Sequence, residues 1–330
     1  MNELKDKNVL MLSPSFFGYE LEIKKELENK GAYVTWYDER PKNDFLTKVF
    51  IRLNFKVFIK KKIYDYYNNI IENTKNSKLD YLFLVAPETI NEELINKIKA
   101  LHPNIKIYVY MWDSVKNKKN GFALLDIADR FFTFDPSDIK INQKIQFLPL
   151  FYINDYANLK SKTAVTKYDI SFVGTVHSDR YPIIKSLEKD FKLFHYFYSP
   201  SKLLFKLQRL LKSSFKTIDP TDIHFESFKK DELLNLINDS KAIIDIEHPD
   251  QKGLTMRTIE MLGARKKFIT TNSNIKEYDF FNEANILVIN RKNPDINKSF
   301  LESPYVNVDN SIYEKYSLSN WIKHIFLVAN

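Results

Sequence analysis

Residues 248–260 combine basic, hydroxyl and acidic side chains in one short stretch, HPDQKGLTMRTIE. Apolar residues within it and just after it recur with a helical spacing and predict a helix over Leu254–Leu262. The N-terminus of a helix carries unpaired backbone N–H groups that favour an anion, and phosphate is the usual one. Lys252 precedes the predicted helix, and Thr255 and Arg257 lie in its first turn. The two cations could therefore add positive charge at an anion site.

Glu260 follows Arg257 by three residues, one turn further along the same helix face. A carboxylate is a poor ligand for phosphate, but it accepts hydrogen bonds from the hydroxyls of a ribose. Two cations, a helix N-terminus and then a carboxylate are what a nucleoside diphosphate joined to a sugar would need. The alternative is an Arg257–Glu260 ion pair on a surface helix, which is common in α/β proteins.

Two strands must position this helix. Ala242–Ile246 is a short apolar run typical of a buried parallel strand, and Phe268–Thr271 resembles it. A strand–helix–strand order places the helix N-terminus at the carboxyl edge of a parallel sheet. The same alternation begins at Asn8–Leu12 and resumes at Tyr168–Val173, which predicts doubly wound parallel sheets in both halves of the chain.

Two carboxylates in the first half also follow predicted strands. Glu88 comes after the apolar run Leu79–Val85, and Asp113 comes after Ile105–Met111. A carboxylate at such a position could take a proton from a hydroxyl that acts as a nucleophile. The alternative is that each side chain caps the next segment or binds the backbone of its own loop.

The first strand ends in the loop SPSFFGYE, which faces the same sheet edge. Phe17 and Gly18 lie in this loop. Gly18 would permit close approach of a ligand to the backbone, although a simple turn glycine explains it equally well.

The segment GLTMRTIEMLGARKKFITTN resembles the donor-site segment of GT-B glycosyltransferases. The resemblance implies that Lys252 or Arg257 contacts the diphosphate of a nucleotide-sugar and that Glu260 contacts the ribose. The chain departs from the pattern at the second glutamate of the EX7E spacing, because Gly253 and Lys252 stand seven and eight residues before Glu260. Whether the anomeric configuration is inverted or retained therefore stays open.

Two further segments resemble the CgeB-like, capsule and lipopolysaccharide branch of these enzymes. YMWDS is similar to an aromatic-Asp-Asp/Ser turn of their N-terminal domain, which implies that Asp113 is the catalytic base. DISFVGTVHSDRYPIIKSL resembles the first strand, loop and helix of their C-terminal domain. This second likeness implies donor contacts from Gly174, Thr175 and Arg180.

The resemblance implies an α/β fold of two Rossmann-like doubly wound domains, the GT-B architecture. We expect an acceptor-binding domain over 1–152, a nucleotide-sugar-binding domain over 153–316, and a helix over 317–330 that crosses back to the first domain. The stretch Leu150–Lys167, which is polar and aperiodic after its first residues, is predicted to be the interdomain linker. Trp321, Ile325 and Val328 share one face of the predicted final helix.

Composition narrows the possible functions. Of 330 residues, 44% are hydrophobic and 28% charged, which is typical of a globular chain. The absence of cysteine excludes a disulfide scaffold and thiolate metal sites. The net charge is +8 and the pI about 9.1, but no helix-turn-helix, zinc-binding or RNP motif appears, so we expect no nucleic-acid partner.

Location follows from the same features. There is no signal peptide and no apolar run long enough to span a bilayer, so we expect a cytoplasmic protein. The long helical region predicted over Asp44–Asn73 is rich in aromatic residues and carries a basic cluster at Lys56 and 60–62. This surface could contact the inner membrane or a lipid-linked acceptor, although a solvated basic face is the simpler interpretation.

The resemblance implies a metal-independent glycosyltransferase that uses no cofactor and transfers a sugar from a nucleotide-sugar to a glycan or lipid-linked acceptor in bacterial surface polysaccharide synthesis. No Asp-x-Asp motif lies in a loop suited to a metal, and GT-B enzymes offset the charge of the leaving group with a helix dipole and basic side chains. The alternatives are a nucleotide-sugar epimerase of the same fold and a non-catalytic protein that binds a sugar or a nucleotide.

Overall fold

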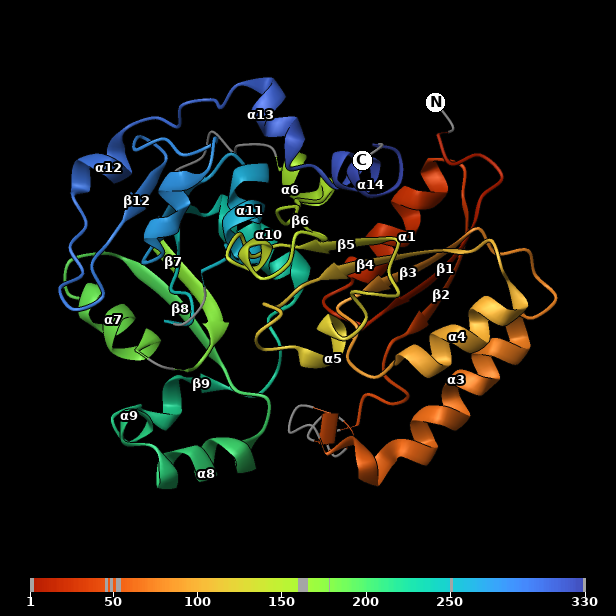
Figure 1. Ribbon diagram of the computed structural model, residues 1–330. Helices are drawn as coiled ribbons and strands as arrows, with labels where there is room; N and C mark the ends of the chain where they lie inside the picture. Colours follow the sequence, from red (N-terminus) through yellow and green to blue (C-terminus); the bar gives the residue numbers. More distant parts are fainter. Residues whose placement is uncertain are drawn as a thin grey trace. The chain divides into compact units, whose positions relative to one another are not determined.

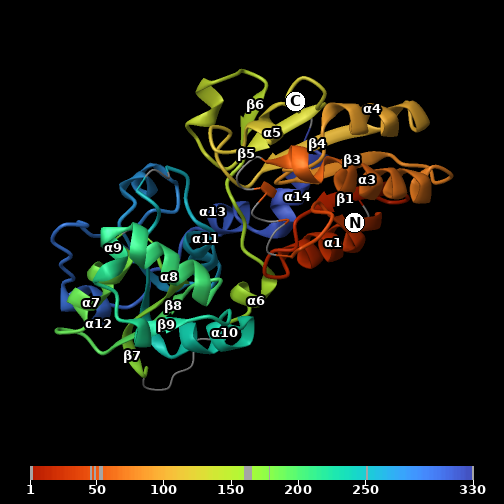
Figure 2. The ribbon, with the colours of Figure 1, turned by 90° about the horizontal axis from the view of Figure 1, so that it is seen from below.

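The chain divides into two structural units, which Figures 1 and 2 show in two views. Unit 1 comprises Met1–Pro149 and Leu318–Asn330, and unit 2 comprises Leu150–Ser317; the predicted boundaries follow residues 152 and 316. The computed structural model describes residues 3–328 except 45, 46, 48, 49, 52–54, 160–165, 178, 250 and 251.

Unit 1 is built on a six-stranded parallel sheet in the order β2-β1-β3-β4-β5-β6. Its strands are β1 (Asn8–Ser13), β2 (Tyr33–Asp38), β3 (Tyr81–Val85), β4 (Lys106–Met111), β5 (Arg130–Thr133) and β6 (Ile145–Phe147). Its helices are α1 (Tyr19–Asn29), η1 (Lys56–Ile59), α3 (Lys60–Thr74), α4 (Glu92–Leu101), α5 (Lys119–Phe122), η2 (Asp138–Lys140) and α14 (Leu318–Phe326). The central strands are mostly apolar because helices cover both faces of the sheet.

Side chains alternate between the two faces of this sheet. Leu82 and Leu84 of β3 join a core cluster with buried residues of α3 and α4. Phe83, between them, points to the other face, where its ring lies 5.9 Å from that of Trp321 in α14. The last helix of the chain therefore packs against this face of the sheet in unit 1.

Arg130 holds the C-terminal end of α14. Its Nη1 donates to the backbone carbonyls of Ile325 at 2.6 Å and of Val328 at 2.9 Å, which supplies positive charge where a helix carries unpaired carbonyls. Ile325 is buried, but Val328 is 42% exposed because it follows the end of the helix. The prediction that Val328 shares a helix face with Trp321 and Ile325 was wrong, because the helix ends at Phe326.

Unit 2 repeats the architecture with a parallel sheet in the order β12-β11-β10-β7-β8-β9. Its strands are β7 (Tyr168–Thr175), β8 (Leu193–Tyr198), β9 (Ile223–His224), β10 (Ser240–Asp245), β11 (Lys267–Thr270) and β12 (Ile286–Val288). Its helices are α6 (Asn154–Ala157), α7 (Arg180–Leu187), α8 (Lys202–Leu211), α9 (Ser213–Lys216), η3 (Pro220–Asp222), α10 (Lys230–Asn238), α11 (Met256–Gly263), η4 (Ser273–Glu277), α12 (Lys298–Glu302) and α13 (Asn310–Lys315).

The predicted linker Leu150–Lys167 is more ordered than its sequence indicates. Phe151 and Tyr152 are buried, and helix α6 packs against α11. Residues 160–165 of the predicted linker lie outside the described residues. Single aromatic side chains become buried in the first part of this segment without forming a repeating pattern, so the sequence pattern alone does not reveal their packing in unit 2.

The helical region predicted over Asp44–Asn73 is only partly described, since residues 45, 46, 48, 49 and 52–54 lie outside the described part. Its second half forms η1 and α3, and Ile63, Tyr67 and Ile70 bury one face of α3. Among the residues that the structure describes, no helix combines the length and the hydrophobicity needed to cross a bilayer.

Each sheet contains a point where the strand order reverses. From β1 the chain first adds β2 on one side and then β3 on the other, and from β7 it adds β8 and later β10. In such sheets a crevice opens between the carboxyl ends of the two strands that flank the reversal, and ligands bind there. The loops that follow these strands comprise residues 14–18 and 86–91 in unit 1, and residues 176–179 and 246–255 in unit 2.

Candidate functional site

The N-terminus of α11 follows the reversal-point loop of unit 2. The helix begins at Met256, so Leu254, predicted as its first residue, instead lies before it and is buried. Thr255 is the N-cap, and its Oγ1 accepts a hydrogen bond from the Thr258 backbone N–H at 3.3 Å. The same hydroxyl donates to Oδ2 of Asp245, at the end of β10, at 2.6 Å. These bonds fix the helix start against the sheet edge.

Arg257 and Glu260 form an ion pair, with Nη1 2.6 Å from Oε2. This is the alternative arrangement that their spacing predicts. Glu260 is buried and Arg257 is only partly exposed, so the pair is held more firmly than one on an open surface. The pairing places the carboxylate of Glu260 in a fixed position, and it reduces the positive charge that Arg257 could offer to an anion.

Lys252 is the exposed cation of this loop. Its backbone carbonyl accepts hydrogen bonds from the side-chain amides of Asn272, at 3.4 Å, and of Asn274, at 3.2 Å. The two amides follow β11, so they tie the loop to the neighbouring strand while the ammonium group stays in solvent. Lys252 is therefore better placed than Arg257 to meet a charged ligand.

Arg180, predicted as a donor contact, is the first residue of α7 and is buried. Its Nε donates to the carbonyl of Ile246 at 2.5 Å, its Nη1 donates to the carbonyl of Thr175 at 2.9 Å, and its Nη2 lies 3.6 Å from Oδ1 of Asp245. The guanidinium thus joins the carboxyl ends of β7 and β10. These contacts give Arg180 a structural part in shaping the crevice.

Gly174 lies inside β7 and not in the loop that follows it. A Cβ atom on Gly174 would lie 2.9 Å from the ring of Phe172 and 3.1 Å from Nη1 of Arg180. The glycine is therefore needed so that the Arg180 guanidinium can cross the strand closely. Thr175, the next predicted contact, ends the strand and is exposed.

A second network of hydrogen bonds and ion pairs lies at this edge and was not predicted from the sequence. Arg291, which follows β12, donates from Nη1 to Asp179 at 2.7 Å and from Nη2 to both the carbonyl and Oε1 of Glu247 at 2.6 Å. Oε2 of the buried Glu247 accepts from Thr271 at 2.6 Å. The network ties together the loops after β7, β10, β11 and β12. The one available signal was that Asp179 and Glu247 come after the predicted strands Tyr168–Val173 and Ala242–Ile246.

Two imidazole rings also lie at this edge. The rings of His177 and His248 are 5.5 Å apart. Burial, reinforced by the nearby Arg180 and His248, lowers the pKa of His177 to about 4. His177 is therefore neutral near pH 7, which suits hydrogen bonding more than anion binding.

In unit 1, Glu88 is buried between two cations. Arg40 donates to its Oε2 from Nη2 at 2.8 Å and from Nε at 3.1 Å, and the Lys118 ammonium binds its Oε1. Burial acts to raise the pKa of Glu88, but Lys118 and then Arg40 outweigh it, so that the pKa is lowered. A carboxylate held ionised in this way is a weak base.

Asp113 is 43% exposed at the side chain. Its Oδ1 accepts from the Ser114 backbone N–H at 2.9 Å and from the Asn117 amide at 3.1 Å, which is the loop-binding alternative. Its Oδ2 lies 3.9 Å from the ammonium of Lys118. The two predicted carboxylates, Asp113 and Glu88, are therefore brought together around one lysine.

A buried acid that the sequence did not reveal supports the Glu88 loop. Glu39 follows β2, and its Oε1 accepts from the backbone N–H groups of Glu88, at 2.7 Å, of Thr89, and of Ile90, at 3.1 Å. Within the described residues its Oε2 has no hydrogen-bond partner. Burial raises the pKa of Glu39 to about 7, so the carboxyl group holds a proton far more readily than an exposed glutamate.

The loop after β1 adopts a left-handed backbone at Phe17, where φ is 52°, and at Gly18, where φ is 81°. A Cβ on Gly18 would meet nothing within 4 Å, so the backbone conformation alone requires glycine there. Phe17 is 67% exposed, and the ring of Phe16 lies 5.9 Å from that of Trp112, beside Asp113. The loops after β1 and β4 thus meet at this edge.

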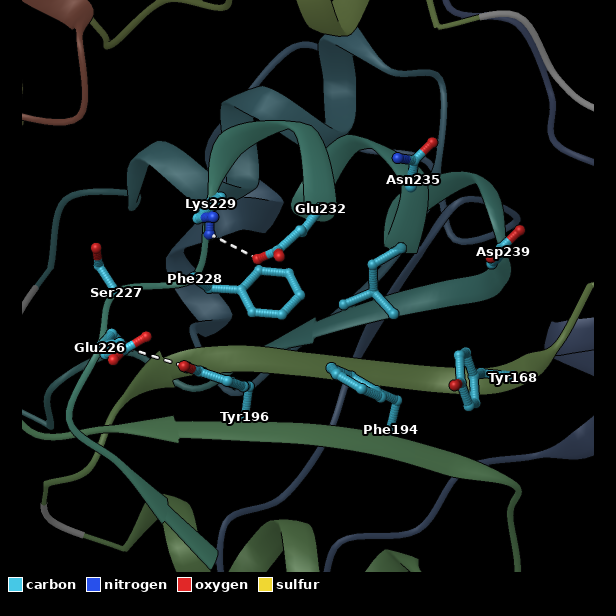
Figure 3. Close-up of a pocket in the computed structure, with 11 residues that line it drawn as sticks. Tyr168, Phe194, Tyr196, Glu226, Ser227, Phe228, Lys229, Glu232, Asn235 and Asp239 are labelled. Carbon is cyan, nitrogen blue, oxygen red and sulfur yellow. Dashed lines mark hydrogen bonds between the residues drawn. The ribbon is translucent and has the colours of Figure 1, made fainter.

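Unit 2 also contains a hollow of about 520 Å³ between β8 and α10 (Figure 3). Aromatic rings of Phe194 and Tyr196 form its floor, and the hydroxyl of Tyr196 donates to the carbonyl of Glu226 at 2.9 Å. The remaining lining residues are Tyr168, Ser227, Phe228, Lys229, Glu232, Asn235, Leu236 and Asp239. It extends along the sheet toward the start of β7, and no residue predicted for the site lines it.

In the part of the chain that the structure describes, no three histidine or acidic side chains gather as a metal site would require.

Solved structures of similar fold span nearly the whole chain. The N-terminal domain of Candida albicans trehalose-6-phosphate phosphatase aligns with a TM-score of 0.59 at 11% identity, covering 97% of this chain and 96% of its own. Anabaena HepE, solved with UDP and glucose, aligns with a TM-score of 0.59 at 9% identity, covering 96% and 97%.

The UDP-forming α,α-trehalose-phosphate synthase of Burkholderia xenovorans, solved with glucose-6-phosphate, aligns with a TM-score of 0.57 at 9% identity, covering 96% of this chain and 98% of its own. The sequence matches no protein-family model and no curated protein. At these identities the likeness concerns the fold, and it confirms the predicted two-domain α/β architecture of GT-B proteins.

Proposed function

We propose that the chain is a metal-independent glycosyltransferase, of the CgeB-like, capsule and lipopolysaccharide branch, that acts in bacterial surface polysaccharide synthesis. The observation that carries the proposal is the N-terminus of α11, capped by Thr255 and preceded by the exposed Lys252, at the reversal point of the sheet in unit 2. Structures of the same fold include HepE, which was solved in complex with UDP-glucose.

In the proposed donor complex, the positive end of α11 and the Lys252 ammonium offset the charge that builds on the departing diphosphate. Glu260, held in place by Arg257, accepts hydrogen bonds from the ribose hydroxyls. Arg180 and Arg291 keep the surrounding loops in position through their contacts with Thr175, Ile246 and Glu247. Because helix dipole and lysine supply the positive charge, the proposal requires no metal ion.

For the acceptor side we propose Asp113 as the base in preference to Glu88. The side chain of Asp113 is 43% exposed and its Oδ2 lies 3.9 Å from the Lys118 ammonium, whereas Glu88 is buried with two cations bound. The acceptor hydroxyl passes its proton to Asp113 while its oxygen attacks the anomeric carbon and the bond from that carbon to the diphosphate breaks.

The proposed acceptor is a glycan or a lipid-linked saccharide, and the exposed loop at Phe17 and Gly18 would flank it. Phe55, Val57 and Phe58 are exposed in unit 1 next to Lys60 and Lys61. This apolar and basic surface supports the proposal that the enzyme works at the cytoplasmic face of the inner membrane.

The donor site is tested by calorimetric titration of the full chain with UDP, GDP, CDP and CMP, and with the corresponding nucleotide-sugars. We expect one nucleotide class to bind, with EDTA having no effect. Lys252→Ala should weaken binding about tenfold because it removes one charge contact. Lys189→Ala is the matched control, since Lys189 is an exposed lysine of unit 2 beyond the end of α7.

The chemistry is tested with the nucleotide-sugar that binds. Asp113→Asn should leave donor affinity unchanged and lower turnover to acceptor by about a hundredfold or more. If no nucleotide binds, or if Lys252→Ala and Lys189→Ala bind alike, the donor assignment is wrong. Release of the sugar by elimination, without any acceptor, would instead support the epimerase alternative.

A further inference from the structure

Helix α8 of unit 2 turns a row of leucines outward. Leu203, Leu207, Leu210 and Leu211 are 65%, 46%, 75% and 83% exposed. Their spacing of four, three and one residues places them along one face of the helix. Large apolar side chains gathered in this way on a soluble surface mark a site of interaction, whereas single exposed leucines do not.

The leucine face is not what attaches α8 to the rest of unit 2. Phe205 is the one buried residue of the helix, and its ring lies 6.1 Å from that of Phe215 and 6.2 Å from that of Phe225. A surface helix ordinarily directs its apolar stripe to the core. Here a single aromatic side chain anchors the helix, and the larger apolar face remains exposed.

The same segment is strongly basic. Residues 202–216 contain Lys202, Lys206, Arg209, Lys212 and Lys216 and no acidic residue. On a helical projection Lys202, Lys206 and Arg209 form a stripe beside the leucines. Long basic side chains in this position can reach toward anionic groups while the leucines next to them enter an apolar layer.

We propose that α8 docks unit 2 on the surface of an anionic phospholipid bilayer, with the four leucines in the interfacial layer and the five cations on the headgroups. A nucleic acid would engage the cations but would leave the leucines without an apolar partner. A bilayer that contains acidic lipids satisfies both faces at once. The inference stands independently of sugar transfer and concerns residues other than the Phe55–Lys61 surface of unit 1.

The docking would also orient unit 2. Only Ser199, Pro200 and Ser201 separate the end of β8 from the start of α8, so the helix emerges at the carboxyl edge of the sheet, as Figure 1 shows. That edge carries the α11 N-terminus. A lipid-linked substrate would then meet this edge of unit 2 near the bilayer surface.

The absence of cysteine allows a direct test. Leu211→Cys in the full chain is labelled with an environment-sensitive fluorophore and mixed with vesicles of phosphatidylcholine alone or of phosphatidylcholine with phosphatidylglycerol. We expect a blue shift only with the anionic vesicles, and reversal by high salt. Leu101→Cys is the matched control, because Leu101 is a 46% exposed leucine at the end of α4 in unit 1, and it should show no shift.

Vesicle flotation of unlabelled protein provides the second measurement. Leu210→Ser with Leu211→Ser should reduce the bound fraction about tenfold or more, and so should Lys206→Glu with Lys212→Glu. Leu101→Ser and Lys189→Glu should bind like the parent protein. All four positions, in α8 or directly after it, are exposed, so the variants are expected to fold, and circular dichroism verifies it.

Three outcomes would overturn the proposal. The first is equal shifts at positions 211 and 101. The second is flotation that responds to Val57 and Phe58 substitutions but not to those in α8. The third is a parent protein that ignores vesicles but dimerises in solution through the leucines, which would make α8 an interface between two copies of the chain.

Discussion

Glu39 shows how a single residue can be more informative in the structure than in the sequence. Three backbone N–H groups converge on its Oε1, while its other oxygen has no partner among the described residues. The carboxyl group thereby holds the loop that carries Glu88. Full burial raises the pKa of Glu39 to about 7, although the backbone N–H groups that it accepts from act to lower it.

This makes Glu39 a source of pH-dependent stability. Below pH 4.5 the carboxyl is protonated in both the folded and the unfolded chain. Between pH 4.5 and about 7 the unfolded chain loses the proton while the folded chain retains it, so the free energy of unfolding falls as pH rises. The loss amounts to about 3 kcal/mol over this interval.

Glu39→Gln should remove this component, because the amide keeps an acceptor oxygen and does not ionise. We expect the free energy of unfolding of the variant, measured by urea denaturation, to rise relative to the parent between pH 4.5 and 7. Other groups titrate in both proteins and cancel in the difference. A difference that stays constant across this range would contradict the assignment.

At the scale of the element, α11 illustrates how a helix start is built. Thr255 satisfies the Thr258 N–H, binds Asp245, and so joins the helix to the end of β10. Asp245 is also 3.6 Å from Arg180, which reaches across to β7. The candidate anion site is therefore held in place by both β10 and β7. Its geometry depends on hydrogen bonds and an ion pair that a bound ligand would not itself contact.

Thr255→Val keeps the side-chain shape and removes the hydroxyl. It should lower the free energy of unfolding by about 1–2 kcal/mol, because the helix loses its cap and Asp245 loses a donor. Thr255→Ser retains the hydroxyl and should cost much less. Denaturant unfolding of the two variants decides the point, and equal losses would mean that the cap contributes nothing.

At the scale of the whole molecule, the last helix, α14, is part of unit 1, the rest of which is mainly residues 1–149. Trp321 is buried in unit 1, with its ring 4.7 Å from that of Tyr110 and 5.9 Å from that of Phe83. Residues 150–317 separate α14 from the rest of unit 1 along the chain. Unit 1 is therefore completed only after the whole of unit 2 has been synthesised.

Trp321→Ala should destabilise unit 1 by about 3–5 kcal/mol, as expected for removing a buried aromatic side chain. Hydrogen exchange should become faster in β3 and β4 while β7 and β10 keep their protection. Lys323→Ala, at an exposed position of the same helix, should change neither. Equal loss of protection in both units would show that α14 stabilises the molecule as a whole and not unit 1 alone.

The sequence by itself determined the features that depend on local pattern. Apolar runs such as Ala242–Ile246 identify buried strands, and their alternation with helices determines a pair of doubly wound sheets. The position of Lys252 before a helix, and of Glu88 and Asp113 after strands, follows from the same pattern. These inferences hold because the periodicity of a strand or a helix depends only on residues that are a few positions apart in the sequence.

Only the tertiary structure decided which partner each charged group takes. Arg180 binds backbone carbonyls, Arg257 pairs with Glu260, and Arg291 bridges Asp179 and Glu247. Burial raises the pKa of Glu39 to about 7. The leucines of α8 likewise face outward although their pattern resembles that of a core helix. Partner choice and burial depend on groups that come together from distant parts of the chain. The local sequence pattern does not show which of these groups will be in contact.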